Sequence, residues 1–168
     1  MRARNYRRIS GSAYTRKEYI GGLPPSRIVH FEMGDPKGVY EYEARLIALE
    51  NAQVRHNALE AARLAVNKLL ERRLGTKAYF FKIAVYPHHV LREHKMMTGA
   101  GADRLSRGMS MAFGRPVGLA ARVRKGQRML FVHVNSSGLD VAKEALRRGA
   151  RKLPMPTRIE IIPLTEEA

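Results

Sequence analysis

The sequence contains no cysteine, which excludes disulfide bonds, thiolate zinc sites and cysteine nucleophiles. No apolar run approaches the roughly 20 residues that a membrane-spanning helix needs, and no hydrophobic signal-peptide core follows the N-terminus, so we expect an intracellular protein without a membrane partner. The Walker lysine motif, the nucleophile elbow and the paired-carboxylate motif are also missing. The sequence therefore predicts no catalytic residue, no cofactor and no small-molecule substrate.

Acidic residues are scarce as well, with 15 against 31 basic residues and a net charge of +16. Such an excess opposes folding by self-repulsion unless a polyanion neutralises it. Nucleic acid is the leading partner, and an anionic membrane surface is the second. The 22 arginines outnumber the 9 lysines, which favours forked phosphate contacts and base stacking, although a GC-rich coding bias would produce the same ratio.

The length of 168 residues and a hydrophobic content of 45% suit one globular domain with a real core. Alternating and helical periodicities predict a single α+β domain over residues 27–168, with a mixed or antiparallel sheet and two helices. Two helices cannot cover both faces of a wide sheet, so we expect the sheet to fold back on itself. The predicted elements are a strand over 27–33, a short strand over 39–43, a helix over 44–74, a strand over 79–86, a hairpin over 117–135, a helix over 136–149 and a strand over 157–164.

Residues 1–26 show no usable periodicity and are interpreted as an extended basic arm that ends in the Gly21–Pro25 punctuation. Tyrosines at positions 6, 14 and 19 are interleaved with its cations, which are Arg2, Arg4, Arg7, Arg8, Arg16 and Lys17. A second basic cluster lies at the tip of the predicted hairpin and consists of Arg122, Arg124, Lys125 and Arg128. RNA is favoured over DNA, because no helix shows a DNA-recognition pattern and basic arms that order on binding suit structured RNA. A frayed, solvated tail and a solvated positive face are the alternatives.

Residues 87–116 are predicted to be a long loop without strong secondary structure, which is typical of functional or disordered segments. The segment is both methionine-rich and cationic, so we interpret it as a loop that an anionic partner orders. Its Gly99-Ala-Gly101 motif is not a dinucleotide fingerprint, since Arg104 stands where the third glycine belongs. His88, His89 and His94 lack the companion ligands of a metal site, and structural or RNA-facing roles are favoured for them.

Several runs resemble one family of universal large-subunit ribosomal proteins, called L-sixteen in bacteria and L-ten-e in archaea and eukaryotes. The loop signature is Gly101-Ala-Asp-Arg-Leu, then Gly108-Met, then Ala112-Phe-Gly-Arg-Pro116. The Arg-Tyr stretch of the arm, the run from Phe81 to Arg92 and the Asn135–Gly138 turn are similar too. The length and the long basic start resemble the archaeal form, since the bacterial form is shorter and the eukaryotic form carries a C-terminal extension.

The resemblance implies a hammerhead-like α/β arrangement and a cytoplasmic, structural role in the large ribosomal subunit. It implies contacts with large-subunit rRNA near the A-site tRNA and the peptidyl-transferase centre, tRNA positioning by the long loop, and a part in late subunit assembly. Neighbouring ribosomal proteins and the A-site and P-site tRNAs are the other implied partners.

Two sets of site residues follow from the basic clusters and the resemblance. The rRNA-binding set is Arg2, Arg4, Arg7, Arg8, Arg16, Lys17, Arg115, Arg122, Arg124, Lys125 and Arg128. The set near tRNA and the peptidyl-transferase centre is Met97, Gly99, Gly101, Asp103, Arg104, Arg107, Met109 and Phe113. Two rival interpretations are an rRNA-processing or rRNA-modifying enzyme that uses His88, His89 or His94, and a chromatin-like DNA packer.

Overall fold

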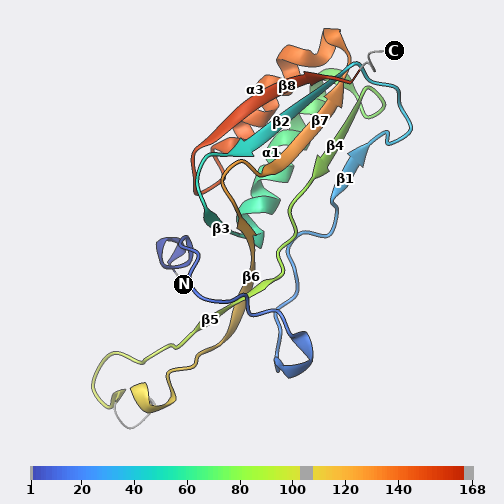
Figure 1. Cartoon of the computed structure of the whole chain (residues 1–168). Helices are drawn as coiled ribbons and strands as arrows, with labels where there is room; N and C mark the ends of the chain where they lie inside the picture. The colour runs from blue at the N-terminus through green and yellow to red at the C-terminus, as the bar shows by residue number, and fades with distance from the viewer. Residues whose placement is uncertain (1, 103–107, 165–168) are drawn as a thin grey trace.

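Two antiparallel sheets organise the residues that the computed structural model describes, which are 2–102 and 108–164 (Figure 1). One sheet has five strands in the order β1-β4-β7-β2-β8, and the other has three in the order β3-β6-β5. With two α-helices in the described ranges, the chain is a single α+β domain, and the predicted fold class is confirmed. The strands are β1 (Glu32–Gly34), β2 (Tyr42–Ala48), β3 (Ala52–Arg55), β4 (Tyr79–Ile83), β5 (His89–Glu93), β6 (Arg115–Val123), β7 (Arg128–Val134) and β8 (Thr157–Pro163). The helices are α1 (His56–Leu74) and α3 (Leu139–Ala150), and single 3-10 turns are η1 (Ala3–Tyr6), η2 (Lys17–Tyr19), η3 (Met109–Met111) and η4 (Ser136–Gly138).

Both helices cover one face of the five-stranded sheet (Figure 1), and the main core lies between these layers. Strand residues such as Leu46, Phe81 and Leu130 are fully buried there. From α1, the buried side chains are Leu59, Ala62, Val66, Leu69 and Leu70, at the spacing of one helical face. Each large apolar side chain buried in this way contributes about 1.5–3 kcal/mol, so this layer is the stable frame of the molecule.

The predicted helix over 44–74 is correct only from His56 onward, because residues 44–55 form most of β2 and all of β3. Alanine and leucine in this stretch suit a helix locally, but they also alternate: Ala44, Leu46 and Ala48 are fully buried. β2 pairs with β7 on one side and with β8 on the other. Two neighbouring strands outweigh a weak local helix preference, since strand preference depends on packing context.

The hairpin predicted over 117–135 is wrong, because β6 and β7 belong to different sheets. β6 pairs with β3 and β5, whereas β7 pairs with β2 and β4. The turn between them, residues 124–127, therefore carries the chain from one sheet to the other. It binds the end of β2 through Gly126 N–H to Ala48 O (2.7 Å) and Ala48 N–H to Gln127 O (3.0 Å).

The predicted loop over 87–116 is shorter than expected, because β5 and the start of β6 lie inside it and pair with each other. The polar residues His89 and Arg92 interrupt the apolar alternation of β5, so its sequence does not show the pattern of a strand. The pairing of β5 with β6 also shifts register after Leu91. The strand predicted over 27–33 is also reduced, to Glu32–Gly34. The short strand predicted over 39–43 begins at Tyr42 and continues to Ala48.

A second, smaller core lies on the three-stranded sheet and includes part of the arm. Ile20 packs there with Val90 and Leu119, and Tyr14 and Leu23 pack against this group. The segment around residues 14–23 is therefore folded against β5 and β6. The boundary proposed at residue 26 between arm and domain stays a prediction.

Candidate nucleic-acid interface

The arm crosses the three-stranded sheet at the end of the molecule from which the long loop projects (Figure 1). Its backbone is held first by β3. The Gln53 N–H donates to Arg7 O (2.7 Å), and the Gln53 Nε2 donates to Arg8 O (2.6 Å). Gln53 is almost fully buried, so these bonds are shielded from water and fix the course of the arm.

Arg122 on β6 holds the next part of the arm with a fork of three hydrogen bonds. Its Nη1 donates to Gly11 O (2.8 Å), and its Nη2 donates to Ser12 O (3.0 Å) and Ser10 O (3.3 Å). A guanidinium suits this arrangement because its donors lie in a fixed plane. Arg122 was assigned to rRNA from the sequence, and in the structure its guanidinium is directed to the arm backbone.

His89 on β5 provides a third attachment for the arm. The Tyr14 N–H donates to His89 Nδ1 (2.9 Å), and the Val90 N–H donates to Tyr14 O (2.9 Å). Burial, followed by the nearby charges of Arg122 and Arg92, lowers the pKa of His89 to about 4. The ring is therefore neutral at pH 7 and can accept the arm's hydrogen bond.

Arg92 joins the arm to the base of the long loop. Its guanidinium carbon lies 3.9 Å from the ring centroid of Phe113 and 4.7 Å from that of Tyr14, and its Nη1 donates to Phe113 O (3.3 Å). The two rings meet edge to face at 5.9 Å, and the Tyr6 hydroxyl donates to Arg92 O (3.3 Å). Arg92 was absent from the predicted site, although the Phe81–Arg92 run that carried the resemblance contains it.

The long loop presents large apolar side chains at the surface. Met97, Met109 and Phe113 are 55%, 71% and 68% exposed. Gly99 and Gly101 have φ values of +128° and +83°, which residues with a Cβ rarely adopt. Asp103, Arg104 and Arg107 from the predicted set lie outside the described residues. The loop therefore combines an apolar surface with backbone turns that depend on glycine.

The other predicted rRNA-binding residues fall into two groups. Arg7 and Arg128 are in ion pairs, with Glu50 at 2.9 Å and Glu43 at 2.8 Å, and Arg128 also lies over the Phe131 ring. The remaining cations are exposed and have no acidic partner among the described residues. They are Arg2, Arg4, Arg8, Arg16 and Lys17 on the arm, Arg115 at the start of β6, and Arg124 and Lys125 on the β6–β7 turn.

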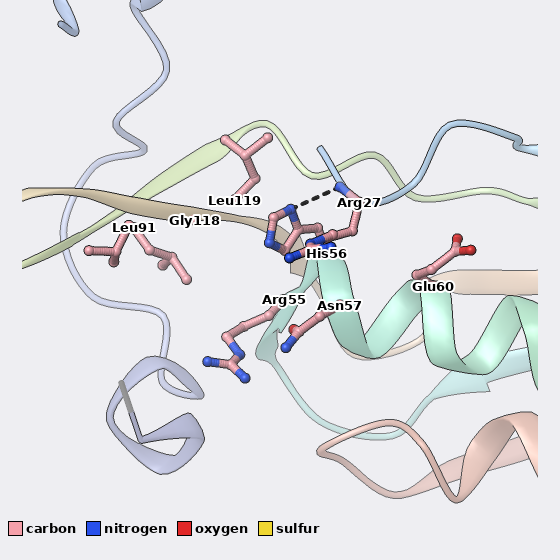
Figure 2. Close-up of a pocket in the computed structure, with 9 residues that line it drawn as sticks. Arg27, Arg55, His56, Asn57, Glu60, Leu91, Gly118 and Leu119 are labelled. Atoms are coloured by element: carbon pink, nitrogen blue, oxygen red, sulfur yellow. Dashed lines mark hydrogen bonds between the residues drawn. The ribbon is translucent and has the colours of Figure 1, made fainter. Parts of the chain in front are cut away.

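A cavity of about 360 Å³ at the start of α1 adds further cations to this end of the molecule (Figure 2). Arg27, Arg55 and His56 line it, together with Leu91 and Leu119 of the three-stranded sheet. The Arg27 N–H donates to His56 Nδ1 (3.2 Å), and burial with the charges of Arg27 and Arg55 lowers the pKa of His56. These residues were not predicted, because the sheet brings them together from distant parts of the chain.

Neither a metal site nor a membrane span is present in the part of the chain that the structure describes. No three histidine, aspartate or glutamate side chains are grouped to hold an ion there, and no helix there is long and apolar enough to cross a bilayer. Of the three loop histidines, His88 packs against the Tyr86 ring with centroids 4.4 Å apart, and His89 binds the arm.

A basic arm fixed on a small sheet beside an exposed apolar loop is an arrangement that suits a protein bound to a polyanion, and comparison with known proteins identifies the family. A family model described as "Ribosomal protein L16p/L10e" matches residues 9–160. "Large ribosomal subunit protein uL16" of Hyperthermus butylicus is 59% identical over 165 residues, which are 98% of this chain and 92% of that protein. The proteins of the same name from Staphylothermus marinus and Saccharolobus islandicus are each 56% identical, covering 96% of this chain and 93% and 92% of theirs.

The chain therefore belongs to the ribosomal protein L16p/L10e family, and the resemblance noted in the sequence is confirmed. Membership makes it a structural component of a ribonucleoprotein that acts in translation, with rRNA and other ribosomal proteins as partners. It is not an enzyme, so the interpretation of His88, His89 and His94 as catalytic residues is set aside. Ribosomes act in the cytoplasm, and this is the location of the protein.

We predict that Arg122→Lys loosens the arm. One ammonium cannot reproduce a fork of three bonds, and each hydrogen bond to a charged group contributes about 1.5–3 kcal/mol. Hydrogen exchange of the amides in residues 8–14 should accelerate by about tenfold or more, since 1.4 kcal/mol is a factor of ten. Arg124→Lys, on the neighbouring turn, is the matched control and should leave this exchange unchanged. Equal protection in both variants would contradict the role given to Arg122.

We predict that His89 makes the protein less stable in mild acid. The unfolded chain binds a proton near pH 6.5 and the folded chain only near pH 4, so its contribution is complete above pH 6.5 and is lost as the pH falls to about 4. With a discount for partial exposure, the loss is about 1 kcal/mol. His89→Gln keeps a hydrogen-bond acceptor without a titrating ring. Denaturant unfolding between pH 7 and 4 should therefore show a shallower loss in this variant, and equal losses would contradict the assignment.

Proposed function

We propose that this protein is a component of the large ribosomal subunit that binds large-subunit rRNA near the A-site tRNA and the peptidyl-transferase centre. The arm and the β6–β7 turn anchor the domain on folded rRNA. The long loop helps to position the A-site tRNA, with the P-site tRNA as a second neighbour, and the protein joins the subunit late in assembly. The names and identity of the relatives support the subunit assignment.

The observation that carries the proposal is the attachment of the arm to the sheet that also bears the loop. Arg122, Gln53 and His89 hold the arm backbone, and Arg92 links the arm to Phe113 at the loop base. Exposed arm cations thereby occupy defined positions at the same end of the molecule as the loop. Contacts from such cations to phosphates position a protein on nucleic acid without reading its sequence.

The loop suits a surface that must adapt to a partner. Methionine is unbranched and polarizable, so Met97 and Met109 can pack against irregular shapes. Phe113 is exposed on one side and stacked on Arg92 on the other, which presents a ring that a base can stack on. These features support contact with tRNA or rRNA, and they require no chemistry from the protein.

We predict that the arm and turn cations control the salt dependence of rRNA binding. In the variant Arg4→Ala, Arg8→Ala, Arg124→Ala and Lys125→Ala, each lost phosphate contact lowers the slope of log K against log salt by about 0.7–0.9. The total change should be about 3. Filter binding to purified large-subunit rRNA measures it, with duplex DNA at the same salt as the comparison for the rival DNA-packing role.

The matched control for this experiment removes four exposed cations elsewhere, at Lys37, Arg73, Lys77 and Arg147. It changes the net charge equally, so a general electrostatic effect would alter both variants alike. Equal slopes for the two variants, or equal affinity of the wild type for duplex DNA, would overturn the proposed anchors.

We predict that replacing residues 98–112 by a short glycine-serine linker separates anchoring from tRNA positioning. The domain should stay folded and bind rRNA as before, because the core and the arm contacts lie outside the replaced segment. Large subunits carrying the variant should bind A-site tRNA about tenfold or more weakly, or should accumulate as late precursors on sucrose gradients. Normal tRNA binding together with normal subunit yield would contradict the function given to the loop.

A further inference from the structure

A groove of about 570 Å³ runs between α1 and α3, away from the interface described above. Its basic lining consists of Lys68 and Arg72 from α1 with Arg148, Arg151 and Lys152 from the end of α3 and the residues after it. None of these five is recognisable as a binding residue from the sequence, because they come from segments about 80 residues apart. Their convergence is a product of helix packing.

Gly149 explains why the two helices approach so closely. A Cβ at this position would lie 2.6 Å from Val66 Cγ2, so no larger residue fits without separating the helices. Lys68 and Arg72 are four residues apart and therefore share one face of α1. Arg148 in the last turn of α3 and Arg151 directly after the helix are three residues apart. Close packing brings the two basic rows to the rim of one groove.

The groove holds an excess of positive charge that the protein itself does not neutralise. Arg148 pairs with Glu144 at 2.5 Å, but both side chains are about half exposed. Lys68, Arg72, Arg151 and Lys152 have no acidic partner within the described ranges, and all are exposed. Clustered like charges repel each other, so a ligand with several negative charges would relieve the repulsion.

The groove is also distant from the arm. α1 begins at His56, beside the three-stranded sheet, and Lys68 lies twelve residues further along, roughly 18 Å at 1.5 Å per residue. The helices occupy one face of the five-stranded sheet, whereas the arm and loop lie at the other end of the molecule (Figure 1). A single short RNA segment that binds the arm would therefore not also occupy the groove.

We propose that the α1–α3 groove binds the phosphate backbone of a second segment of rRNA, so that the domain bridges two RNA segments. The inference rests on the proposed function and extends it, since the arm anchors one segment and the helical layer receives another. Three of the five lining cations are arginines, whose forked donors suit phosphate oxygens. The chain has a net charge of +16 and belongs to a ribosomal protein family, so RNA is the polyanion whose charge complements the groove.

The first test compares two variants of equal charge in filter binding to purified large-subunit rRNA. The groove variant carries Lys68→Ala, Arg72→Ala, Arg151→Ala and Lys152→Ala, and the control carries Lys37→Ala, Arg73→Ala, Lys77→Ala and Arg147→Ala. Circular dichroism and thermal unfolding confirm that both are folded. The proposal expects the salt slope to fall by about 3 in the groove variant and by less than 1 in the control. Equal slopes would overturn it.

The second test asks whether the groove and the arm contact different RNA. The chain has no cysteine, so Lys68→Cys and Lys125→Cys each create one attachment point for a tethered iron chelate that cleaves nearby RNA. In assembled large subunits, the proposal expects cleavage from both positions, at separate rRNA segments. No cleavage from position 68, as with an acidic protein in the groove, or cleavage at the same segment from both positions, would overturn it. Cleavage from position 68 without any from position 125 would instead contradict the proposed function.

Discussion

The fork that Arg122 makes to the backbone of the arm is the interaction on which the basic end of the molecule depends. Without it, the backbone around Ser10, Gly11 and Ser12 would lose its attachment to β6, and ordering that part of the arm on RNA would carry an entropic cost. With it, the carbonyls of Ser10, Gly11 and Ser12 share one guanidinium, and Gln53 and His89 extend the attachment on both sides. The guanidinium of Arg122 therefore fixes the course of the arm, which carries other cations.

Near this attachment, two turns form a corner of the molecule. At this corner the chain passes between the two sheets twice. The β2–β3 turn and the β6–β7 turn lie against each other, joined by the bonds between Ala48 and residues 126 and 127 and by Lys125 N–H to Asn51 Oδ1 (2.7 Å). The β2–β3 turn leads from the five-stranded sheet to the three-stranded sheet, and the β6–β7 turn leads back. These bonds connect the helical layer to the small sheet that carries the arm and the loop.

The surplus charge is distributed over both ends of the domain and is not confined to one. Exposed cations lie on the arm and the corner, others line the cavity at the start of α1, and a further set lines the groove between α1 and α3. Carboxylates are placed mainly where they pair: Glu43 with Arg128, and Glu50 with Arg7. This distribution suits the proposed contacts with RNA on more than one side, because an unpaired cation serves binding only where a phosphate can reach it.

The sequence by itself determined the class of fold, the helix from His56 onward, the demand for a polyanion and the family, because periodicity, charge and motif spacing are local properties. Tertiary structure alone decided that residues 44–55 are strands, that β6 and β7 part into different sheets, and that β5 exists, since strand pairing depends on partners far away along the chain. It also decided the roles of single cations. Arg122 and Arg128 look like Arg124 in the sequence, yet the first holds the arm, the second pairs with Glu43, and the third faces solvent. The basic groove forms because α1 and α3 meet at Gly149. The sequence pattern of neither helix predicts that contact.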